Sequence, residues 1–254
     1  LSPRTIRNYK YIRDNNLKTL MEIKVSNITQ DTVQKIINEE TLNYSPKTVR
    51  DFHGLIYAVL KTLRPEFTLN TVLPASKRPV LYVPSDEDIK KVLKTSKGTD
   101  LELPILLAAF GPMRRGEICA LHTDDISGNT VHVTKNMVLN DCNEWTIKTP
   151  KTYSGDRYIT YPSFVIEKLK IKSGKVTELN PDMLSCRFRR FLKRCNVSHF
   201  RFHDLRHYCA SVMHALGVPD AYIMQRAGWG NDGVLKTVYR HVLDDRTSEM
   251  NSIA

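Results

Sequence analysis

A cluster of prolines at residues 74–84 limits how this chain can fold more than any other feature. The stretch reads Pro-Ala-Ser-Lys-Arg-Pro-Val-Leu-Tyr-Val-Pro, with three prolines in eleven positions. Proline cannot continue a helix, and it biases the residue before it toward extended backbone. We therefore expect a stiff linker, which at about 3.1 Å per residue reaches roughly 30 Å. The linker separates a domain at residues 1–73 from a larger one at residues 85–254.

Residues 1–73 show the pattern of a helical domain. Ser45-Pro46 supplies a cap and a first-turn proline for one helix, and Pro65 ends it. Between them apolar residues recur at helical spacing, namely Val49, Phe52, Ile56, Val59, Leu60 and Leu63. A similar opening occurs earlier at Ser2-Pro3, and in both places basic residues follow the cap.

Basic side chains are denser in the first part of the chain than in the rest. Residues 1–83 hold 13 Lys+Arg and 7 Asp+Glu, a surplus of six, against a surplus of five over residues 84–254. A cation at a helix N-terminus opposes the helix dipole, and a bound phosphate would relieve this conflict. A face that is only solvated by water is the alternative for each residue. The candidate DNA contacts are Arg4, Arg7, Lys10, Lys47 and Arg50, with Lys77 and Arg78 in the linker.

Residues 85–254 mix helices with a few strands. We expect a helix from Ser85, an apolar helix over 101–110, and helices again from about residue 163. Strands are predicted over 129–139, 144–149 and 157–161. The predicted fold class is α+β and mostly helical, with an all-helical first domain and a helix-rich second domain that holds one small antiparallel sheet.

Several classes of function lack support in the sequence. No apolar run reaches the roughly 18 residues that span a bilayer, and no signal peptide opens the chain. The five cysteines are scattered and form no C-x-x-C, which favours a reducing compartment over a disulfide scaffold or zinc ribbon. The phosphate-loop, dinucleotide and H-E-x-x-H motifs are absent, so we expect no metal and no cofactor. The net charge of +11 leaves nucleic acid or a membrane surface as the polyanion.

Cationic side chains recur along residues 85–254 in places that are unremarkable one by one. Arg114 and Arg115 open an apolar helix, Lys151 joins two predicted strands, and His203 and Arg206 share one face of a helix start. Gly228-Trp229 comes shortly before Tyr239. Alone, each reads as a solvated helix start, a solubilising lysine or a packing residue. Only the ordered set is specific.

In that order, Arg-Arg-Gly-Glu, hairpin Lys, His-x-x-Arg, Gly-Trp and Tyr-x-His resemble the tyrosine recombinase (integrase) family, of phage or conjugative-transposon type. The resemblance covers essentially the whole chain, because residues 1–73 look like that family's core-binding domain and residues 85–254 like its catalytic domain. It implies a catalytic set of Arg114, Lys151, His203, Arg206, Trp229 and the nucleophile Tyr239. This chain departs from the family pattern at Pro112, before the catalytic helix, and at Trp229, where histidine is commoner.

The residue types suit transfer of a DNA strand. Two guanidiniums with forked donors can hold the non-bridging oxygens of a phosphodiester as charge gathers there. A tyrosine hydroxyl, with a pKa of about 10, needs a group such as His203 to take or direct its proton. Lys151 would protonate the departing 5′ oxygen, and Glu117 would pair with a nearby arginine or histidine. The expected intermediate is a 3′-phosphotyrosine link to DNA.

The expected function is therefore site-specific recombination that integrates or excises a mobile element. A type IB topoisomerase and a DNA-binding regulator with a decayed active site remain as alternatives. The resemblance implies double-stranded DNA and a homotetramer on two duplexes as partners, with accessory DNA-bending or excision factors as candidates and no membrane. The implied location is the bacterial cytoplasm, at the nucleoid. Leu1 in place of Met is consistent with a fragment from which an N-terminal arm-binding domain has been removed.

Overall fold

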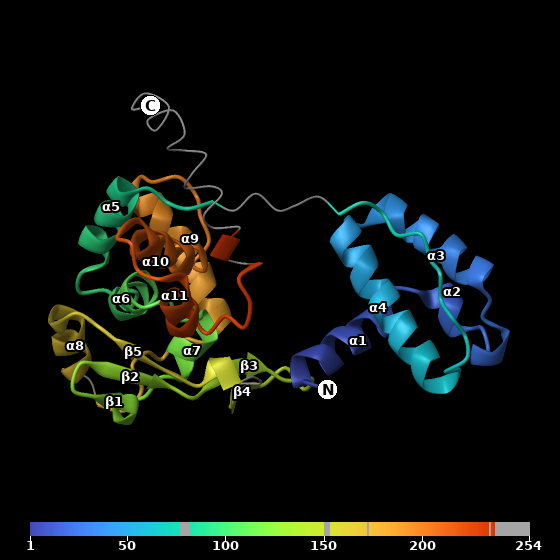
Figure 1. Cartoon of the computed structure of the whole chain (residues 1–254), viewed down its shortest axis with the longest axis horizontal. Helices are drawn as coiled ribbons and strands as arrows, with labels where there is room; N and C mark the ends of the chain where they lie inside the picture. The colour runs from blue at the N-terminus through green and yellow to red at the C-terminus, as the bar shows by residue number, and fades with distance from the viewer. Residues whose placement is uncertain (77–81, 150–152, 172, 234, 237–254) are drawn as a thin grey trace. The chain divides into compact units, whose positions relative to one another are not determined.

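The computed structural model describes residues 1–76, 82–149, 153–171, 173–233 and 235–236. The chain divides into two compact units (Figure 1), one formed by Leu1–Val80 with Asn140–Asn143 and the other by Leu81–Leu139 with Glu144–Ala254. Helices dominate the described residues of both units, and every strand found there lies between residues 126 and 160.

The described part of the first unit is built on helices α1 (Pro3–Asn15), α2 (Lys18–Met21), α3 (Gln30–Asn43) and α4 (Pro46–Leu63), with a 3-10 turn at Val25–Asn27. The Ser2 and Ser45 hydroxyls accept the backbone N–H groups of Thr5 and Thr48 at 3.2 and 3.3 Å, so both predicted caps are confirmed. The apolar faces of these helices share one core, which includes Ile12, Val33, Ile37, Phe52 and Leu60.

The second unit begins with three helices, α5 (Asp86–Ser96), α6 (Glu102–Phe110) and α7 (Arg115–Ala120). Ser85 caps α5 as predicted, because its hydroxyl accepts the Asp88 backbone N–H at 3.1 Å. Helix α6 is apolar all round, and its residues 103–109 are buried. It packs against α5, α7, α8 and α10, so it forms the centre of the unit.

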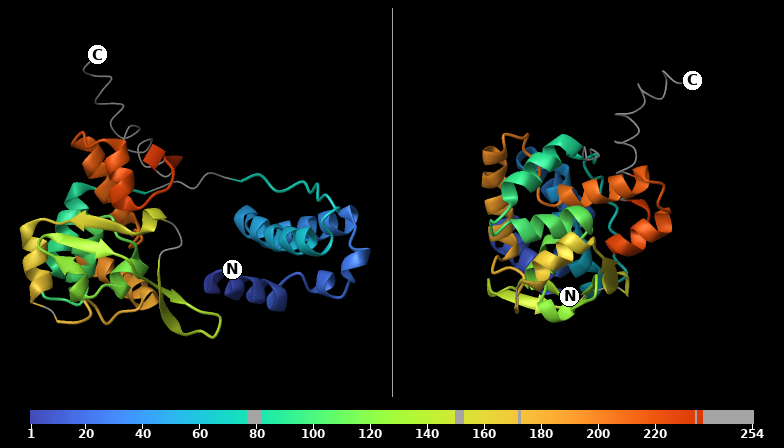
Figure 2. Two further views of the ribbon diagram at one scale, coloured as in Figure 1. Left: turned by 60° about the horizontal axis from the view of Figure 1, so that its bottom comes forward. Right: turned by 90° about the vertical axis from the view of Figure 1, so that its left-hand side faces the viewer.

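The strands of the second unit are short and antiparallel. β1 (Ile126–Ser127), β2 (Thr130–Val133) and β5 (Arg157–Thr160) form a three-stranded sheet in the order β1-β2-β5, while β3 (Asn136–Leu139) and β4 (Trp145–Lys148) form a separate hairpin. Val131 pairs with Ile159, and both side chains are fully buried. Helices cover that face of the sheet (Figures 1 and 2), whereas Tyr158 on the other face is exposed.

The remaining helices carry most of the candidate site. They are α8 (Ser163–Lys170), α9 (Pro181–Cys195), α10 (Asp204–Ala215) and α11 (Asp220–Ala227). Phe188 of α9 and Leu205 of α10 join α6 in the main core of the unit. Helix α10 packs against both α6 and α11, and Arg206 in its first turn donates to the Ala227 carbonyl at the end of α11.

The predicted class, α+β and mostly helical, is confirmed. Two details differ. The run 129–139 that we expected to be one strand is two, β2 and β3. The strands form two separate sheets where we expected one, because β2 pairs with β1 and β5 while β3 pairs with β4. The hairpin thereby leaves the sheet and contacts α7 instead. Among the described residues no helix has the length and apolar character needed to cross a membrane.

Candidate active site

Arg114 lies immediately before helix α7, where its own helix holds it in place. Glu117, in the first turn of α7, accepts the Arg114 backbone N–H at 2.7 Å and the Arg114 Nη1 at 2.8 Å. The carboxylate also offsets the unfavourable placement of a cation at a helix N-terminus. Arg114 Nη2 donates to the Gly228 carbonyl at 2.7 Å, which ties the start of α7 to the end of α11. The Arg114 side chain remains 37% exposed and can meet a ligand.

Arg206 is an arginine enclosed by protein. It lies in the first turn of α10 with 1% of its surface exposed. Nη1 donates to the Pro112 carbonyl, and Nη2 donates to the Ala227 carbonyl at 2.6 Å, whereas Nε has no partner among the described residues. Burial and the neighbouring Arg114 lower the pKa of Arg206 from its ordinary value. A guanidinium keeps its proton in proteins, so Arg206 is a positive charge inside the unit.

Pro112, which departs from the family pattern, does not displace this part of the site. Helix α7 still begins at Arg115, directly after Arg114. Since the interaction with Arg206 uses the backbone carbonyl of residue 112, proline can provide it as any other residue would.

His203 directly precedes α10 and is exposed. The surrounding chain removes water from the ring, and together with the nearby His207 and Arg206 this lowers the pKa of His203 below its ordinary value of 6.5. Its ring stands edge-on to that of His207, with 4.9 Å between the ring centres. At neutral pH His203 is therefore uncharged and able to accept a proton.

Trp229 follows a glycine that the local backbone requires. Gly228 ends α11 in the left-handed region, with φ of 65°, and a Cβ there would stand 2.7 Å from the Ser154 carbonyl oxygen. The Arg206 guanidinium carbon lies 5.0 Å from the centre of the Trp229 ring, close enough for a cation–π contact. The half-buried indole thus packs beside the buried Arg206.

Arg157 is a functional candidate that our sequence reasoning missed. It begins β5 with its side chain 3% exposed, and its Nη1 and Nη2 donate to the two carboxylate oxygens of Glu117 at 3.1 and 2.8 Å. Its position on the strand was the available signal. Arg157 and Ile159 point to the same, buried face, so the period-two pattern places a charge in the interior.

Glu117 is therefore an ionised carboxylate shared by two arginines. Burial alone would raise its pKa, but hydrogen bonds and charge from Arg157, with the charges of Arg114 and Arg206, hold the pKa below its ordinary value. The expectation that Glu117 pairs with a nearby arginine agrees with this geometry.

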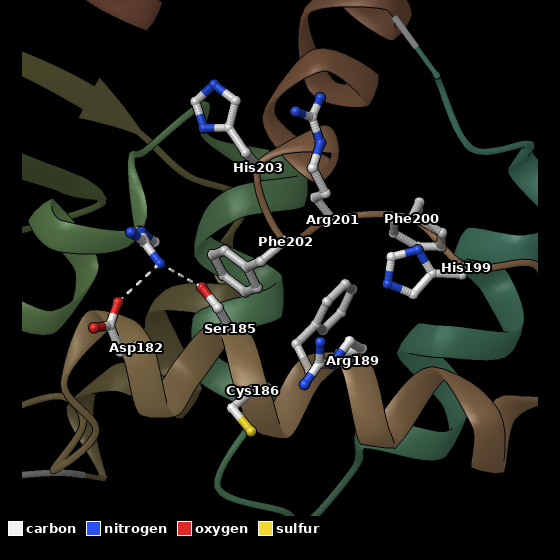
Figure 3. Close-up of a pocket in the computed structure, with 11 residues that line it drawn as sticks. Asp182, Ser185, Cys186, Arg189, His199, Phe200, Arg201, Phe202 and His203 are labelled. Carbon is white, nitrogen blue, oxygen red and sulfur yellow. Dashed lines mark hydrogen bonds and ion pairs between the residues drawn. The ribbon is translucent and has the colours of Figure 1, made fainter. Parts of the chain in front are cut away.

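A pocket of about 530 Å³ adjoins His203 (Figure 3). Phe188, Phe200 and Phe202 form part of its wall, and the rest of the lining holds the basic residues Arg115, Arg189, His199 and Arg201 together with Asp182, Ser185 and Cys186. Arg115 is the partner of Ser185 in this pocket, donating to its hydroxyl at 2.7 Å. Basic side chains of this kind can bind phosphate groups, and one of them, Arg115, is paired with Asp182 at 3.4 Å. The described residues contain no cluster of side chains suited to hold a metal ion.

The structure thus brings together Arg114, His203, Arg206 and Trp229, with Glu117 beneath them. Lys151 and Tyr239 lie outside the described residues, as do Lys77 and Arg78. The other candidate DNA contacts are exposed on helices α1 and α4, and these are Arg4, Arg7, Lys10, Lys47 and Arg50. Their contact with DNA stays a prediction. The described residues therefore gather two guanidiniums, a neutral imidazole and an indole, which are residue types that suit an anionic phosphate.

Comparison with known proteins identifies a family for this chain. The phage integrase family model matches residues 85–246. A XerC-like tyrosine recombinase from Caldanaerobacter subterraneus subsp. tengcongensis is 27% identical over 195 residues, which cover 63% of this chain and 50% of the relative. An integrase from Saccharopolyspora erythraea is 42% identical over 53 residues, 21% of this chain and 12% of that protein. The chain thus spans at most half the length of these relatives.

Two solved structures share the fold. The integrase of transposon Tn1549, in complex with transposon right-end DNA, superposes with a TM-score of 0.68 at 17% identity over 98% of this chain and 91% of its own. A lambda integrase fragment, a dimer bound to a core site, gives 0.69 at 15% identity over 94% and 89%. These likenesses confirm the fold that the motif order implies. The family model covers more than half of the chain, including the segments that carry Arg114, His203, Arg206 and Trp229. The chain therefore belongs to the phage integrase family.

Proposed function

We propose that this protein is a site-specific DNA recombinase that cuts and rejoins DNA through a 3′-phosphotyrosine and so integrates or excises a mobile element. One observation carries the proposal. Arg114 and Arg206 come from distant parts of the sequence, yet their guanidiniums are held by adjacent carbonyls, those of Gly228 and Ala227. Two fixed cations at one point, next to a neutral histidine, suit a transferring phosphoryl group.

In the proposed reaction the Tyr239 oxygen attacks the scissile phosphorus, and the bond from phosphorus to the 5′ oxygen breaks. The tyrosine proton passes to His203 or to a group that His203 directs, and Lys151 protonates the departing 5′ oxygen. Arg114 and Arg206 hold the non-bridging oxygens, and Trp229 donates its indole N–H or packs against them. Rejoining reverses these steps with another 5′ hydroxyl. The phosphotyrosine conserves the energy of the broken bond.

The proposed partners are double-stranded DNA and three further copies of the chain, forming a tetramer on two duplexes. A lambda integrase tetramer bound to a Holliday junction shares the fold, with a TM-score of 0.67, 16% identity and coverage of 92% of this chain and 73% of its own. We assign residues 1–73 to DNA gripping, 74–84 to the linker and 85–254 to catalysis. The proposed location is the bacterial cytoplasm, at the nucleoid. Accessory DNA-bending or excision factors are further proposed partners.

The test has two steps. Sequencing the DNA that becomes covalently attached to the wild type first identifies the end of the element. Covalent trapping is then measured on a nicked suicide substrate made from that end. The wild type should form an adduct that survives denaturation. Tyr239→Phe should bind the same DNA but form none, while Tyr222→Phe, a change at an exposed tyrosine of α11, should trap normally. An adduct in Tyr239→Phe would refute the nucleophile, and no adduct in the wild type would favour a decayed regulator. Relaxation of any supercoiled plasmid without site preference would favour a topoisomerase.

A further inference from the structure

The buried Arg157 side chain makes hydrogen bonds to several segments around the candidate site. Besides the two bonds to Glu117, its Nε donates to the Arg226 carbonyl at 2.9 Å, and its Nη1 also donates to the Gly155 carbonyl at 3.2 Å. One side chain thus joins β5, α7, the last turn of α11 and the 3-10 turn Tyr153–Gly155.

We propose, resting on the function proposed above, that Arg157 is a positioning residue for DNA cleavage, which sets the orientation of Arg114 through Glu117. A short series of hydrogen bonds connects Arg157 to Arg114. Arg157 fixes the Glu117 carboxylate, and Glu117 binds both the backbone N–H and the Nη1 of Arg114. Arg114 Nη2 then binds the Gly228 carbonyl, two residues beyond the Arg226 carbonyl that Arg157 holds.

Close packing between Arg157 and Gly228 adds to these hydrogen bonds. A Cβ placed on Gly228 would lie 3.1 Å from Arg157 Nη1 and 3.2 Å from its Cδ, so the arginine lies directly against the glycine whose carbonyl Arg114 uses. A shift of Arg157 is therefore expected to move two of the groups that orient Arg114, namely the Glu117 carboxylate and the Gly228 backbone.

Only arginine can make this set of bonds. Four acceptor oxygens surround the guanidinium, two from Glu117 and one each from Gly155 and Arg226. A planar fork with five N–H donors can reach acceptors on several sides, whereas a lysine ammonium donates from a single point. Arg157→Lys keeps the charge near Glu117 and removes the geometry, which makes it the informative variant.

The electrostatics of the Glu117–Arg157 pair favour a role in positioning the site over a role in stabilising the fold. A buried ion pair gains little net stability, since the cost of removing both charges from water nearly cancels their attraction. Replacing both partners with apolar residues of similar size is often tolerated, whereas removal of one partner strands a charge. The combination Glu117→Met with Arg157→Met should therefore fold and still cleave poorly, which separates the two roles.

The experiment measures single-turnover cleavage of the suicide substrate, binding of the same DNA, and thermal unfolding. Arg157→Lys is expected to bind DNA within about threefold of the wild type and to cleave about a hundredfold more slowly, the loss typical of a catalytic group misplaced by about 1 Å. Arg187→Lys, at a half-exposed surface arginine of α9, is the matched control and should cleave normally. Cleavage by Arg157→Lys, or by the double methionine variant, at the wild-type rate would overturn the proposal.

Two further measurements test the route through Arg114. If Arg157 acts through Arg114, adding Arg157→Lys to Arg114→Lys should cause little further loss of cleavage, because the two changes remove the same function. Multiplying losses would refute this route. A substrate with a bridging 5′ sulfur releases a thiolate that needs no proton from Lys151, so the defect of Arg157→Lys should persist on it. Full recovery there would assign Arg157 to the segment carrying Lys151 and overturn the proposal.

These outcomes are distinct from failure of the proposed function. A wild type that forms no covalent adduct refutes the recombinase itself. A wild type that forms one, beside an Arg157→Lys variant of equal rate, refutes the positioning role alone.

Discussion

Replacing Gly228 with alanine should damage both the stability and the chemistry of the site. Gly228 has a φ of 65°, and a Cβ there would stand 2.7 Å from the Ser154 carbonyl oxygen. The left-handed backbone costs a non-glycine residue roughly 1–2 kcal/mol. Overlap with a backbone atom that cannot rotate away adds about 1–3 kcal/mol. The free energy of unfolding should therefore fall by roughly 2–5 kcal/mol in Gly228→Ala.

Gly217 supplies the matched control for this change. Its φ is 74°, but no atom of the described residues lies within 4 Å of a Cβ placed on it. Gly217→Ala should lose only the backbone cost of roughly 1–2 kcal/mol, so the difference between the two variants isolates the overlap at Gly228. At about 2–4 °C per kcal/mol for chains of this size, thermal unfolding followed by circular dichroism resolves that difference.

The effect on cleavage should separate the two glycines further. The Gly228 carbonyl accepts Arg114 Nη2, and Trp229 is the next residue, so a displaced Gly228 disturbs both. Gly228→Ala should cleave a suicide substrate at least about tenfold more slowly at a temperature where it remains folded, since small misplacements of catalytic groups are costly. Gly217→Ala should cleave normally. Equal melting temperatures for the two variants, or normal cleavage by Gly228→Ala, would refute the assignment of the close approach.

Two other measurements follow from charge. Burial lowers the pKa of His207 to about 4; between that value and 6.5 the unfolded chain binds a proton that the folded chain does not, so stability should fall by about 1.4 kcal/mol per unit as the pH drops. Urea unfolding should show a shallower pH slope in His207→Gln, and an unchanged slope would contradict a buried neutral histidine. Replacing Lys47 and Arg50 with alanine should reduce the slope of log affinity for DNA against log salt by about 0.9 for each phosphate that the protein no longer neutralises; an unchanged slope would leave these two residues as solvated surface.

Local rules in the sequence predicted the helix starts well. Ser2, Ser45 and Ser85 each cap a helix as expected, because a serine before a proline or before acidic residues satisfies orphan backbone N–H groups with no help from the rest of the fold. The order of motifs also predicted which residues gather, namely Arg114, His203, Arg206 and Trp229. In the structure these four residues lie near one another, and their individual roles stay predictions.

What the sequence did not predict depends on contacts between distant segments. Residues 129–139 look like one strand, and their division between two partners is decided by β4 and β5, which come later in the chain. Arg157 could not be recognised as central because its acceptors lie on Glu117, Gly155 and Arg226, and only the folded chain brings these together. A polar residue at an inward strand position was the one local signal.

The arginines of the site outnumber the carboxylates beside them. Arg114, Arg157 and Arg206 surround one carboxylate, that of Glu117, among the described residues of the site. The arrangement therefore carries an excess of positive charge in a region from which water is largely excluded, and mutual repulsion contributes to the lowered pKa of Arg206. In the proposed function, a bound phosphodiester brings one negative charge next to these guanidiniums. Binding the substrate would thus remove an electrostatic cost that folding alone leaves in place, which gives the site a physical reason to select a phosphate over a neutral group.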